Sequence, residues 1–366
     1  MSEEITQATP EKKVIDVRKL LKSTLKLGSS DLHLVVGSEP QIRIDKELKA
    51  LKLDKLTSKD IDDMANSLIK EKQKKEFEEN NELDFSFEIE NVGRFRANYY
   101  KTIGGTACAF RMIPIEIPTL DEYGNNPIFK ELVKKEKGLI LVTGPTGSGK
   151  STTLASMLHE INLTERKHII TIEDPVEFVH KNEKSLFSQR DVGSNTESFS
   201  SAIKYALRQD PDIILIGEMR DAETIGAALT AAETGHLVFG TLHTNSAPGT
   251  INRIIDVFPA DKQAQVRAQL SASLVAVIAQ SLIPRVGSGK VATQEVLISN
   301  AAIANLIRED KVHQLYSQMQ LNQNETGMRT QTQEIMELLA KNIITKENAV
   351  KNSNRLDELK KSLESL

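Results

Sequence analysis

The sequence has 366 residues but no tryptophan, a single cysteine and few aromatic residues, and each shortage excludes something. Aromatic residues make up 4 % of the chain, which argues against a surface on which nucleic-acid bases stack. The single cysteine, Cys108, cannot form an intrachain disulfide or a zinc cluster of thiolates. We therefore expect Cys108 to be a small buried apolar side chain in a reducing compartment.

An excess of charge of one sign is also missing. Lysine and arginine total 47, and aspartate and glutamate total 51, so the formal net charge is −4. A protein that is basic overall, as many nucleic-acid-binding proteins are, is therefore excluded, although a local basic patch is not.

No segment has the pattern of a signal peptide or of a membrane span. Residues 1–13 are polar, with no apolar core behind a basic start, and we expect them to be disordered. The most apolar stretch, residues 272–283, has a helical pattern but is too short to cross a bilayer. We therefore expect a soluble, cytoplasmic protein.

The pattern of apolar residues divides the chain into two regions. In residues 14–112, helical stretches and alternating strands predict a small α+β domain. Residues 113–118 contain Pro114 and Pro118, which stop both helix and central strand, so they predict a semi-rigid linker. The remaining region, residues 119–366, is predicted to be a second domain of the α/β class.

The second region alternates short apolar runs with helical stretches, which favours a parallel sheet covered on both faces. Beyond residue 259 the pattern is mostly helical, with a hairpin expected around residues 287–289. Residues 331–366 are rich in lysine and glutamate and predict a solvated surface helix. The apolar runs are residues 139–143, 168–172, 212–216 and 236–242.

A glycine-rich motif after the first run is the strongest functional signal. Residues 144–152, GPTGSGKST, fit the phosphate-binding loop (P-loop) pattern G-x-x-x-x-G-K-[ST] between a predicted strand and a predicted helix. Glycines let backbone N–H groups surround phosphate oxygens, and a helix N-terminus favours negative charge. Lys150 would reach the β- and γ-phosphates, and the Ser151 hydroxyl would ligate Mg²⁺. The predicted nucleotide-binding residues are Gly144, Pro145, Thr146, Gly147, Ser148, Gly149, Lys150, Ser151 and Thr152.

Two of the later apolar runs are followed by carboxylates. Glu218 follows residues 212–216, on a strand that we expect to lie next to the P-loop strand, and could orient water or hold Mg²⁺ through water. Glu173 and Asp174 follow residues 168–172 and could act on Mg²⁺-bound water or on the attacking water. The alternatives are a solvated strand end for Glu218 and a turn for the other two, which Asp-Pro favours.

Histidines and arginines are less specific signals. His236 and His243 flank the last apolar run, and His243 stands at its carboxyl end, where it could sense a γ-phosphate by a hydrogen bond. A core or capping role stays open for both. Arg96 and Arg111 lie on predicted strands of the first domain, and from the residues alone they are solvated charges at strand edges.

Together these motifs resemble the secretion ATPases of the type II secretion and type IV pilus superfamily. The family's Asp box appears as ITIEDPVEF at residues 170–178, its Walker B segment at residues 207–221, and its His box as TGHLVFGTLHTNSA at residues 234–247. In the first domain, SSDLHL at residues 29–34 and GRFRANYY at residues 93–100 also match. The resemblance extends over about residues 15–350.

The resemblance implies a PAS-like first domain (14–112), a RecA-like motor domain (119–366), and assembly as a homohexamer that uses ATP and Mg²⁺. It implies that Glu218 is the catalytic base, and that Glu173 and Asp174 assist Mg²⁺ and water. It also implies that His243 senses the γ-phosphate. By the same resemblance, Arg96 and Arg111 close on the phosphates, which suits the charge spread over a phosphoryl group in transfer.

Two features resemble the retraction branch of this family. The extension and secretion ATPases usually carry a further N-terminal domain and a four-cysteine zinc hairpin, whereas this chain has one cysteine and thirteen residues before its first expected helix. Residues 302–309 resemble the branch motif AIRNLIRE, with Ala304 in place of an arginine. A plain amphipathic helix is the alternative for this segment. The residues predicted to couple hydrolysis to the pilus machine are Asn305, Leu306, Ile307, Arg308 and Glu309.

The predicted function is therefore that of a hexameric ATPase motor for pilus retraction, at the cytoplasmic side of the inner membrane. Its expected partners are the inner-membrane pilus platform protein and, as a further candidate, an accessory retraction ATPase; nucleic acid is not expected. The alternatives are an accessory retraction ATPase or a pilus assembly or secretion ATPase. A DNA translocase and an ATP-binding scaffold without hydrolysis are less favoured.

Overall fold

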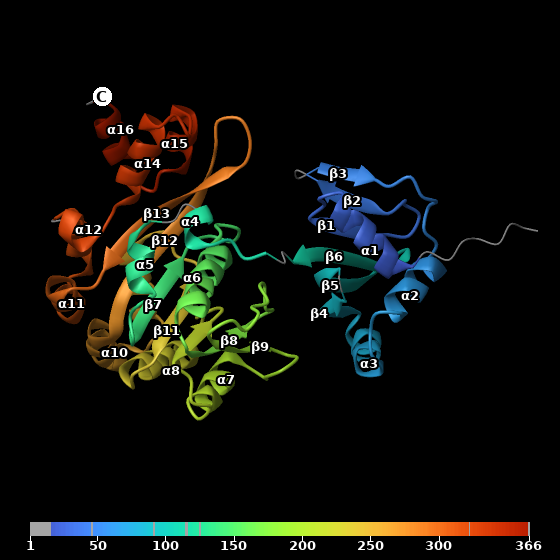
Figure 1. Cartoon of the computed structure of the whole chain (residues 1–366), viewed down its shortest axis with the longest axis horizontal. Coiled ribbons are helices and arrows are strands. Elements are labelled where there is room, and N and C mark those ends of the chain that lie inside the picture. Colours follow the sequence, from blue (N-terminus) through green and yellow to red (C-terminus); the bar gives the residue numbers. More distant parts are fainter. Residues whose placement is uncertain are drawn as a thin grey trace, which may run out of the picture. The chain divides into compact units, whose positions relative to one another are not determined.

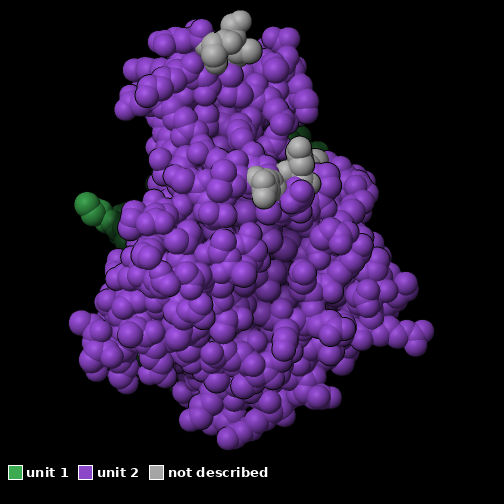
Figure 2. All heavy atoms as spheres, turned by 90° about the vertical axis from the view of Figure 1, so that its left-hand side faces the viewer, with its two compact units in different colours: residues 1–115 green, residues 116–366 purple. Residues whose placement is uncertain are grey.

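The computed structural model describes residues 16–44, 47–90, 92–113, 116–123, 126–321 and 323–364. By its internal contacts the chain divides into two units, residues 1–115 and residues 116–366, which Figure 2 colours separately. Each unit has its own sheet and its own buried core. The segment 1–13, expected to be disordered, lies outside the described residues, as does Pro114 of the expected linker.

In the described part of unit 1, strands pair antiparallel in the order β3-β2-β1-β6-β5-β4. Along β5, Phe95, Ala97 and Tyr99 are buried, because alternate residues of a strand point to the same face. Phe77 of α3 packs edge-on against Tyr99, so α3 covers this face. The elements are α1 (Val17–Lys26), β1 (Asp31–Leu34), β2 (Gln41–Ile44), β3 (Glu47–Ala50), α2 (Ser58–Asn66), α3 (Glu71–Asn80), β4 (Glu82–Ile89), β5 (Gly93–Thr102) and β6 (Gly105–Ile113) (Figure 1).

Two details of unit 1 bear on the sequence-based predictions. Cys108 is fully buried on β6, as predicted, and burial raises the pKa of its thiol. Ile113, expected to begin the linker, is instead the last residue of β6, where it pairs with Arg94 and is buried.

Unit 2 contains a mainly parallel sheet with the strand order β13-β12-β7-β11-β10-β8-β9. Only β12 and β13 pair antiparallel among the described strands of this sheet. The strands are β7 (Gly138–Thr143), β8 (His168–Glu173), β9 (Leu186–Asp191), β10 (Ile213–Ile216), β11 (Leu237–Leu242), β12 (Leu274–Pro284) and β13 (Lys290–Ile298).

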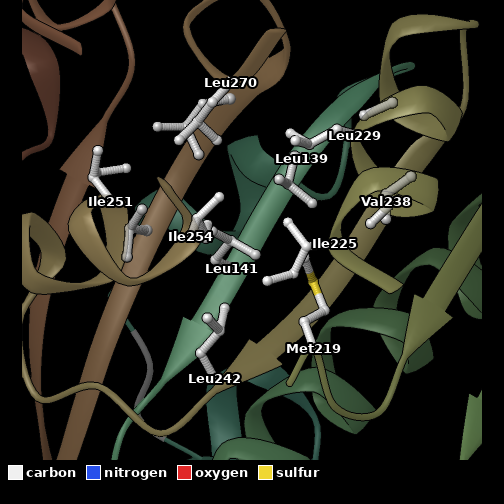
Figure 3. Close-up of a cluster of buried hydrophobic side chains, with 14 of the residues drawn as sticks. Leu139, Leu141, Met219, Ile225, Leu229, Val238, Leu242, Ile251, Ile254 and Leu270 are labelled. Carbon is white, nitrogen blue, oxygen red and sulfur yellow. The ribbon is translucent and has the colours of Figure 1, made fainter. Parts of the chain in front are cut away.

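Helices cover both faces of this sheet, so its central strands are buried on both sides. On β7, Leu139 and Leu141 join one core cluster and Ile140 and Val142 join the other, as the two-residue period of a strand requires. Figure 3 shows the first cluster, in which Leu141 lies near Ile225 of α8. The helices before β12 are α4 (Leu120–Tyr123), α5 (Ile128–Leu132), α6 (Lys150–Thr164), α7 (Phe199–Ala206), α8 (Ala222–Glu233), α9 (Ala247–Asp256) and α10 (Ala260–Ser273).

The prediction of a helical pattern at residues 272–283 is wrong, because residues 274–284 form strand β12. This strand lies between β7 and β13, with Val277 in one core cluster and Ile278 in the other. Apolar residues on both faces hide the two-residue period, and a short apolar run of this kind resembles a buried helix. The hairpin expected around residues 287–289 is present and joins β12 to β13.

The carboxyl-terminal residues form several short helices rather than the single solvated surface helix that was predicted. Three of them share a small core with β12, in which Ile283, Ile335, Leu338 and Leu359 are buried. The helices after β13 are α11 (Ala301–Arg308), the 3₁₀ helix η1 (Val312–Gln314), α12 (Leu315–Met319), α13 (Gln323–Thr326), α14 (Gln331–Ala340), α15 (Lys346–Asn352) and α16 (Leu356–Glu364). Within the described ranges, none of the helices is both long and apolar enough to span a bilayer.

Candidate active site

The predicted site residues of unit 2 follow the carboxyl ends of parallel strands, which meet at one edge of the sheet. The prediction that the strand before Glu218 lies next to the P-loop strand is wrong. Strand β11 lies between β7 and β10 and pairs with both, so that Gly240 stands opposite Leu141 on one side and Ile216 on the other. The segment with His243 therefore follows the strand between the P-loop and Glu218.

The P-loop between β7 and α6 has a backbone that needs its glycines. Gly144, Gly147 and Gly149 have φ angles of 144°, 76° and 86°, in the region that favours glycine. A Cβ on Gly144 would lie 2.1 Å from the carbonyl oxygen of Gln280 on β12, so a larger residue cannot stand there. The loop is therefore a turn shaped by the backbone, of the kind in which N–H groups bind phosphate.

The polar groups of the loop fit a bound phosphate chain. Lys150 begins the 15-residue helix α6, and its Nζ donates hydrogen bonds to the carbonyl oxygens of Gly144 at 2.9 Å and Pro145 at 3.3 Å. Burial lowers the pKa of Lys150. Ser148 is 3 % exposed, and its hydroxyl has no hydrogen-bond partner among the described residues. A phosphate at the N-terminus of α6 would supply an acceptor for both groups.

Glu218 follows β10 and is contacted by two basic residues, Arg220 and His243. His243 Nε2 lies 2.9 Å from Glu218 Oε1, and Arg220 Nε donates a hydrogen bond to the same oxygen. Burial raises the pKa of Glu218, but the hydrogen bonds and charges of Arg220 and His243 outweigh burial and lower it. Glu218 is therefore ionised at neutral pH and able to accept a proton. Asp221, the residue after Arg220, caps α8 by accepting a hydrogen bond from the Thr224 N–H at 2.8 Å.

At Glu173, the last residue of β8, the pKa moves in the opposite direction to that of Glu218. Burial raises its pKa to about 7, although a hydrogen bond from the Glu177 N–H at 3.4 Å acts in the other direction. The end of β10 lies close by, since a Cβ on Gly217 would stand 3.0 Å from Glu173 Cα. Asp174, which follows, is exposed, and its charge adds to the field that raises the pKa of Arg220.

The two histidines make different contacts. His236 precedes β11, at the end of the strand opposite to His243. Its Nδ1 lies 3.0 Å from the Ala231 carbonyl oxygen and 3.3 Å from the Thr234 hydroxyl, so it caps the end of α8. Of the two, His243 alone contacts Glu218, while 45 % of its side chain stays exposed.

The predicted arginines of unit 1 are cross-strand neighbours. Arg96 of β5 stands opposite Arg111 of β6. Within unit 1 each is paired with a carboxylate: Arg96 Nε donates to Asp84 at 3.1 Å, and Arg111 Nε donates to Asp31 at 2.9 Å. Their action on a nucleotide stays a prediction.

The residues of the predicted coupling segment, 305–309, differ in their burial. Ile307 is fully buried in the core of unit 2, as is Ile303, so its assignment as a contact residue is not supported. The polar members lie together on the outer side of α11, where Asn305 Nδ2 donates to Glu309 at 3.0 Å and Arg308 donates to Asn305 Oδ1 at 2.9 Å. Leu306 is partly buried.

One further residue at the site, Gln280, was not predicted from the sequence. Gln280 interrupts the apolar run of β12, and its 2 % exposed side chain hydrogen-bonds to the Ser148 carbonyl oxygen and to the Thr153 hydroxyl. These partners lie 132 and 127 residues away in the chain. A lone glutamine in an apolar run was the only signal available.

Comparison with known proteins defines the class. A family model described as type II/IV secretion system protein matches residues 6–364, and the chain belongs to this family. It is 51 % identical over 335 residues to the type IV pilus retractation ATPase PilT of Pseudomonas aeruginosa, covering 92 % of this chain and 97 % of that protein. It is 49 % identical over 311 residues to a twitching motility protein of Neisseria gonorrhoeae, covering 85 % of this chain and 83 % of that one.

A solved structure supports the same class. The crystal structure of the pilus retraction motor PilT with bound ADP matches with a TM-score of 0.90 at 49 % identity, covering 95 % of this chain and 99 % of that chain. The predictions of the secretion ATPase family, of a RecA-like α/β motor with an N-terminal domain, and of a P-loop ATPase are confirmed.

Proposed function

We propose that the chain is a homohexameric motor that hydrolyses ATP to drive retraction of type IV pili. The observation that carries the catalytic part is the hydrogen bond between Glu218 and His243. His243 follows β11, the strand beside the P-loop strand β7, and Glu218 follows β10, the next strand along. The pilus part rests on similarity over almost the whole length of a retraction ATPase.

In the proposed mechanism, the loop at residues 144–152 binds the phosphates of ATP. Lys150 exchanges the carbonyl oxygens that it now contacts for β- and γ-phosphate oxygens. The Ser151 hydroxyl would hold Mg²⁺, with Glu173 and Asp174 acting through water; the ion would neutralise phosphate charge. These side chains follow β7 and β8 at one sheet edge, which suits that arrangement.

Glu218 is the proposed general base. It accepts a proton from the attacking water, whose oxygen bonds to the γ-phosphorus as the bond to the bridging oxygen of ADP breaks. Arg220 and His243 keep the carboxylate ionised until that step. His243, half exposed and bonded to Glu218, would sense the γ-phosphate, and Arg96 and Arg111 of the first unit would close on the phosphates.

In the cell, we place the hexamer at the cytoplasmic face of the inner membrane, against the pilus platform protein. The exposed residues Arg308 and Glu309, with the partly exposed Asn305, are the candidate contact, and an accessory retraction ATPase is a further candidate partner. Nucleic acid is not proposed as a partner, because the net charge of −4 and the low aromatic content of the sequence argue against it.

The decisive test is complementation of a deletion strain. A retraction motor predicts that deletion leaves cells piliated but without twitching, and that the wild-type gene restores twitching while Lys150→Ala and Glu218→Ala do not. Loss of surface pili on deletion would instead identify an assembly ATPase. Purified protein separates the remaining alternatives: steady phosphate release excludes a scaffold, and stimulation by DNA would support a translocase.

A further inference from the structure

This inference rests on the proposed nucleotide site and concerns how its loop is held. The parallel register of β12 against β7 pairs Ala279 with Thr143. The next residue on β12, Gln280, therefore lies beside Gly144, the first residue of the loop. The two backbones are so close that a Cβ on Gly144 would stand 2.1 Å from the Gln280 carbonyl oxygen. The backbone of β12 thus supports the start of the loop.

The side chain of Gln280 reaches the other end of the same loop. Its Nε2 donates to the Ser148 carbonyl oxygen at 2.7 Å, and its Oε1 accepts from the Thr153 hydroxyl on α6 at 2.8 Å. Gln294 of β13 donates to the same Oε1 at 3.1 Å. Because two donors face Oε1 and a carbonyl oxygen faces Nε2, a flipped amide would lose these bonds, and one orientation is fixed.

We propose that Gln280 is a positioning residue that holds the loop in its phosphate-binding shape before nucleotide arrives. The peptide plane that carries the Ser148 carbonyl also carries the Gly149 N–H, so a fixed carbonyl fixes the direction of that N–H. The Thr153 hydroxyl on α6 donates to the same Gln280 amide that binds the Ser148 carbonyl oxygen. The amide therefore links the Ser148 peptide to α6. Nucleotide then meets donors already in place, and the ordering of the loop does not weaken binding.

A loop ordered in advance acts equally on the bound substrate and on the transition state, so its loss raises KM and leaves kcat nearly unchanged. Gln280→Met keeps the volume and removes both polar groups. We expect it to raise the KM for ATP and the Kd for ADP about tenfold, the order of one buried hydrogen bond, with kcat within about twofold of the parent. Thr153→Val should act in the same direction, whereas Thr153→Ser keeps the hydroxyl and should bind ADP like the parent.

The matched control is Thr293→Val. Thr293 is fully buried in the same hairpin, and its hydroxyl lies 2.7 Å from that of Ser281, away from the loop. This variant should unfold at lower urea concentration and bind ADP like the parent. The measurements are titration with a fluorescent ADP analogue, steady-state hydrolysis, and urea unfolding without nucleotide.

The inference is overturned if Gln280→Met and Thr153→Val bind ADP like the parent, or if Thr293→Val weakens binding as much as they do. Should Gln280→Met not fold, the comparison of Thr153→Val with Thr153→Ser decides. Lys150→Ala is measured in parallel. Hydrolysis by Lys150→Ala at the parental rate would refute the proposed site itself. If Lys150→Ala loses hydrolysis but Gln280→Met binds ADP like the parent, only the positioning role is refuted.

Discussion

Replacement of Arg220 by glutamine tests the electrostatic state of the proposed base. Burial alone would raise the pKa of Glu218, and the Arg220 hydrogen bond is the largest contribution that lowers it. Without the guanidinium, the pKa of Glu218 rises, and less of the base is ionised in mildly acidic solution. The Arg220 side chain is 75 % exposed, so water weakens the pair to at most about 1 kcal/mol, a factor of about five.

The assay is single-turnover ATP hydrolysis with enzyme in excess, which reports the chemical step rather than product release. We expect the ratio of the rate at about pH 5.5 to the rate at about pH 8 to fall by less than about twofold in Arg220→Gln, because about 1 kcal/mol moves a pKa that lies below 4.5 by less than one unit. Glu173 titrates in both proteins, so its effect cancels in the comparison. Arg253→Gln, at an exposed arginine of α9, is the control and should leave the ratio unchanged. An equal loss of rate at both pH values would refute the electrostatic role of Arg220.

Glu218→Gln keeps the shape of the proposed base but cannot take a proton, so phosphate release should fall about 10²- to 10⁴-fold while ADP still binds; near-parental turnover would contradict the assignment. Burial raises the pKa of Glu173 from 4.5 to about 7. Between these two pH values the folded state binds a proton that the unfolded state has lost, so the free energy of unfolding declines as pH rises from 4.5 to about 7. Glu173→Gln should remove roughly 1–3 kcal/mol of that decline, measured by urea unfolding at about pH 5 and about pH 8; an unchanged decline would argue against the shift. Ile307→Ala should lower the free energy of unfolding by about 2–5 kcal/mol, whereas Arg308→Ala should leave stability and hydrolysis intact and reduce twitching; normal twitching in Arg308→Ala would exclude this surface.

Local chemistry made much of the site predictable from the sequence. Strand, glycine-rich loop and helix are consecutive around Lys150, and phosphate binding at a helix N-terminus needs only that local order. Glu218 and Glu173 were recognisable because each follows an apolar run whose carboxyl end must meet the same sheet edge.

The features that were not predicted from the sequence depend on contacts between segments far apart in the chain. The position of β11 between β7 and β10 is a property of strand order, on which the apolar runs carry no information. The strand β12 lost its two-residue period because both of its faces are buried. The polar edge strand β9 had no apolar run to mark it, and Gln280 acquires its role only through partners far away in the chain.

The strand order also explains how chemistry and sensing can be joined. Glu218 and Glu173 follow neighbouring strands, yet Arg220 and His243 keep the first ionised while burial raises the pKa of the second to about 7. Carboxyl groups whose pKa values are moved in opposite directions can divide acid and base work. In the proposed mechanism Glu218 loses its negative charge when it accepts the proton of water, and the interaction that holds His243 at 2.9 Å would weaken in the same step. Because β11 lies between β7 and β10, the residue that the proposed step would release, His243, is the one that follows the strand beside the P-loop strand.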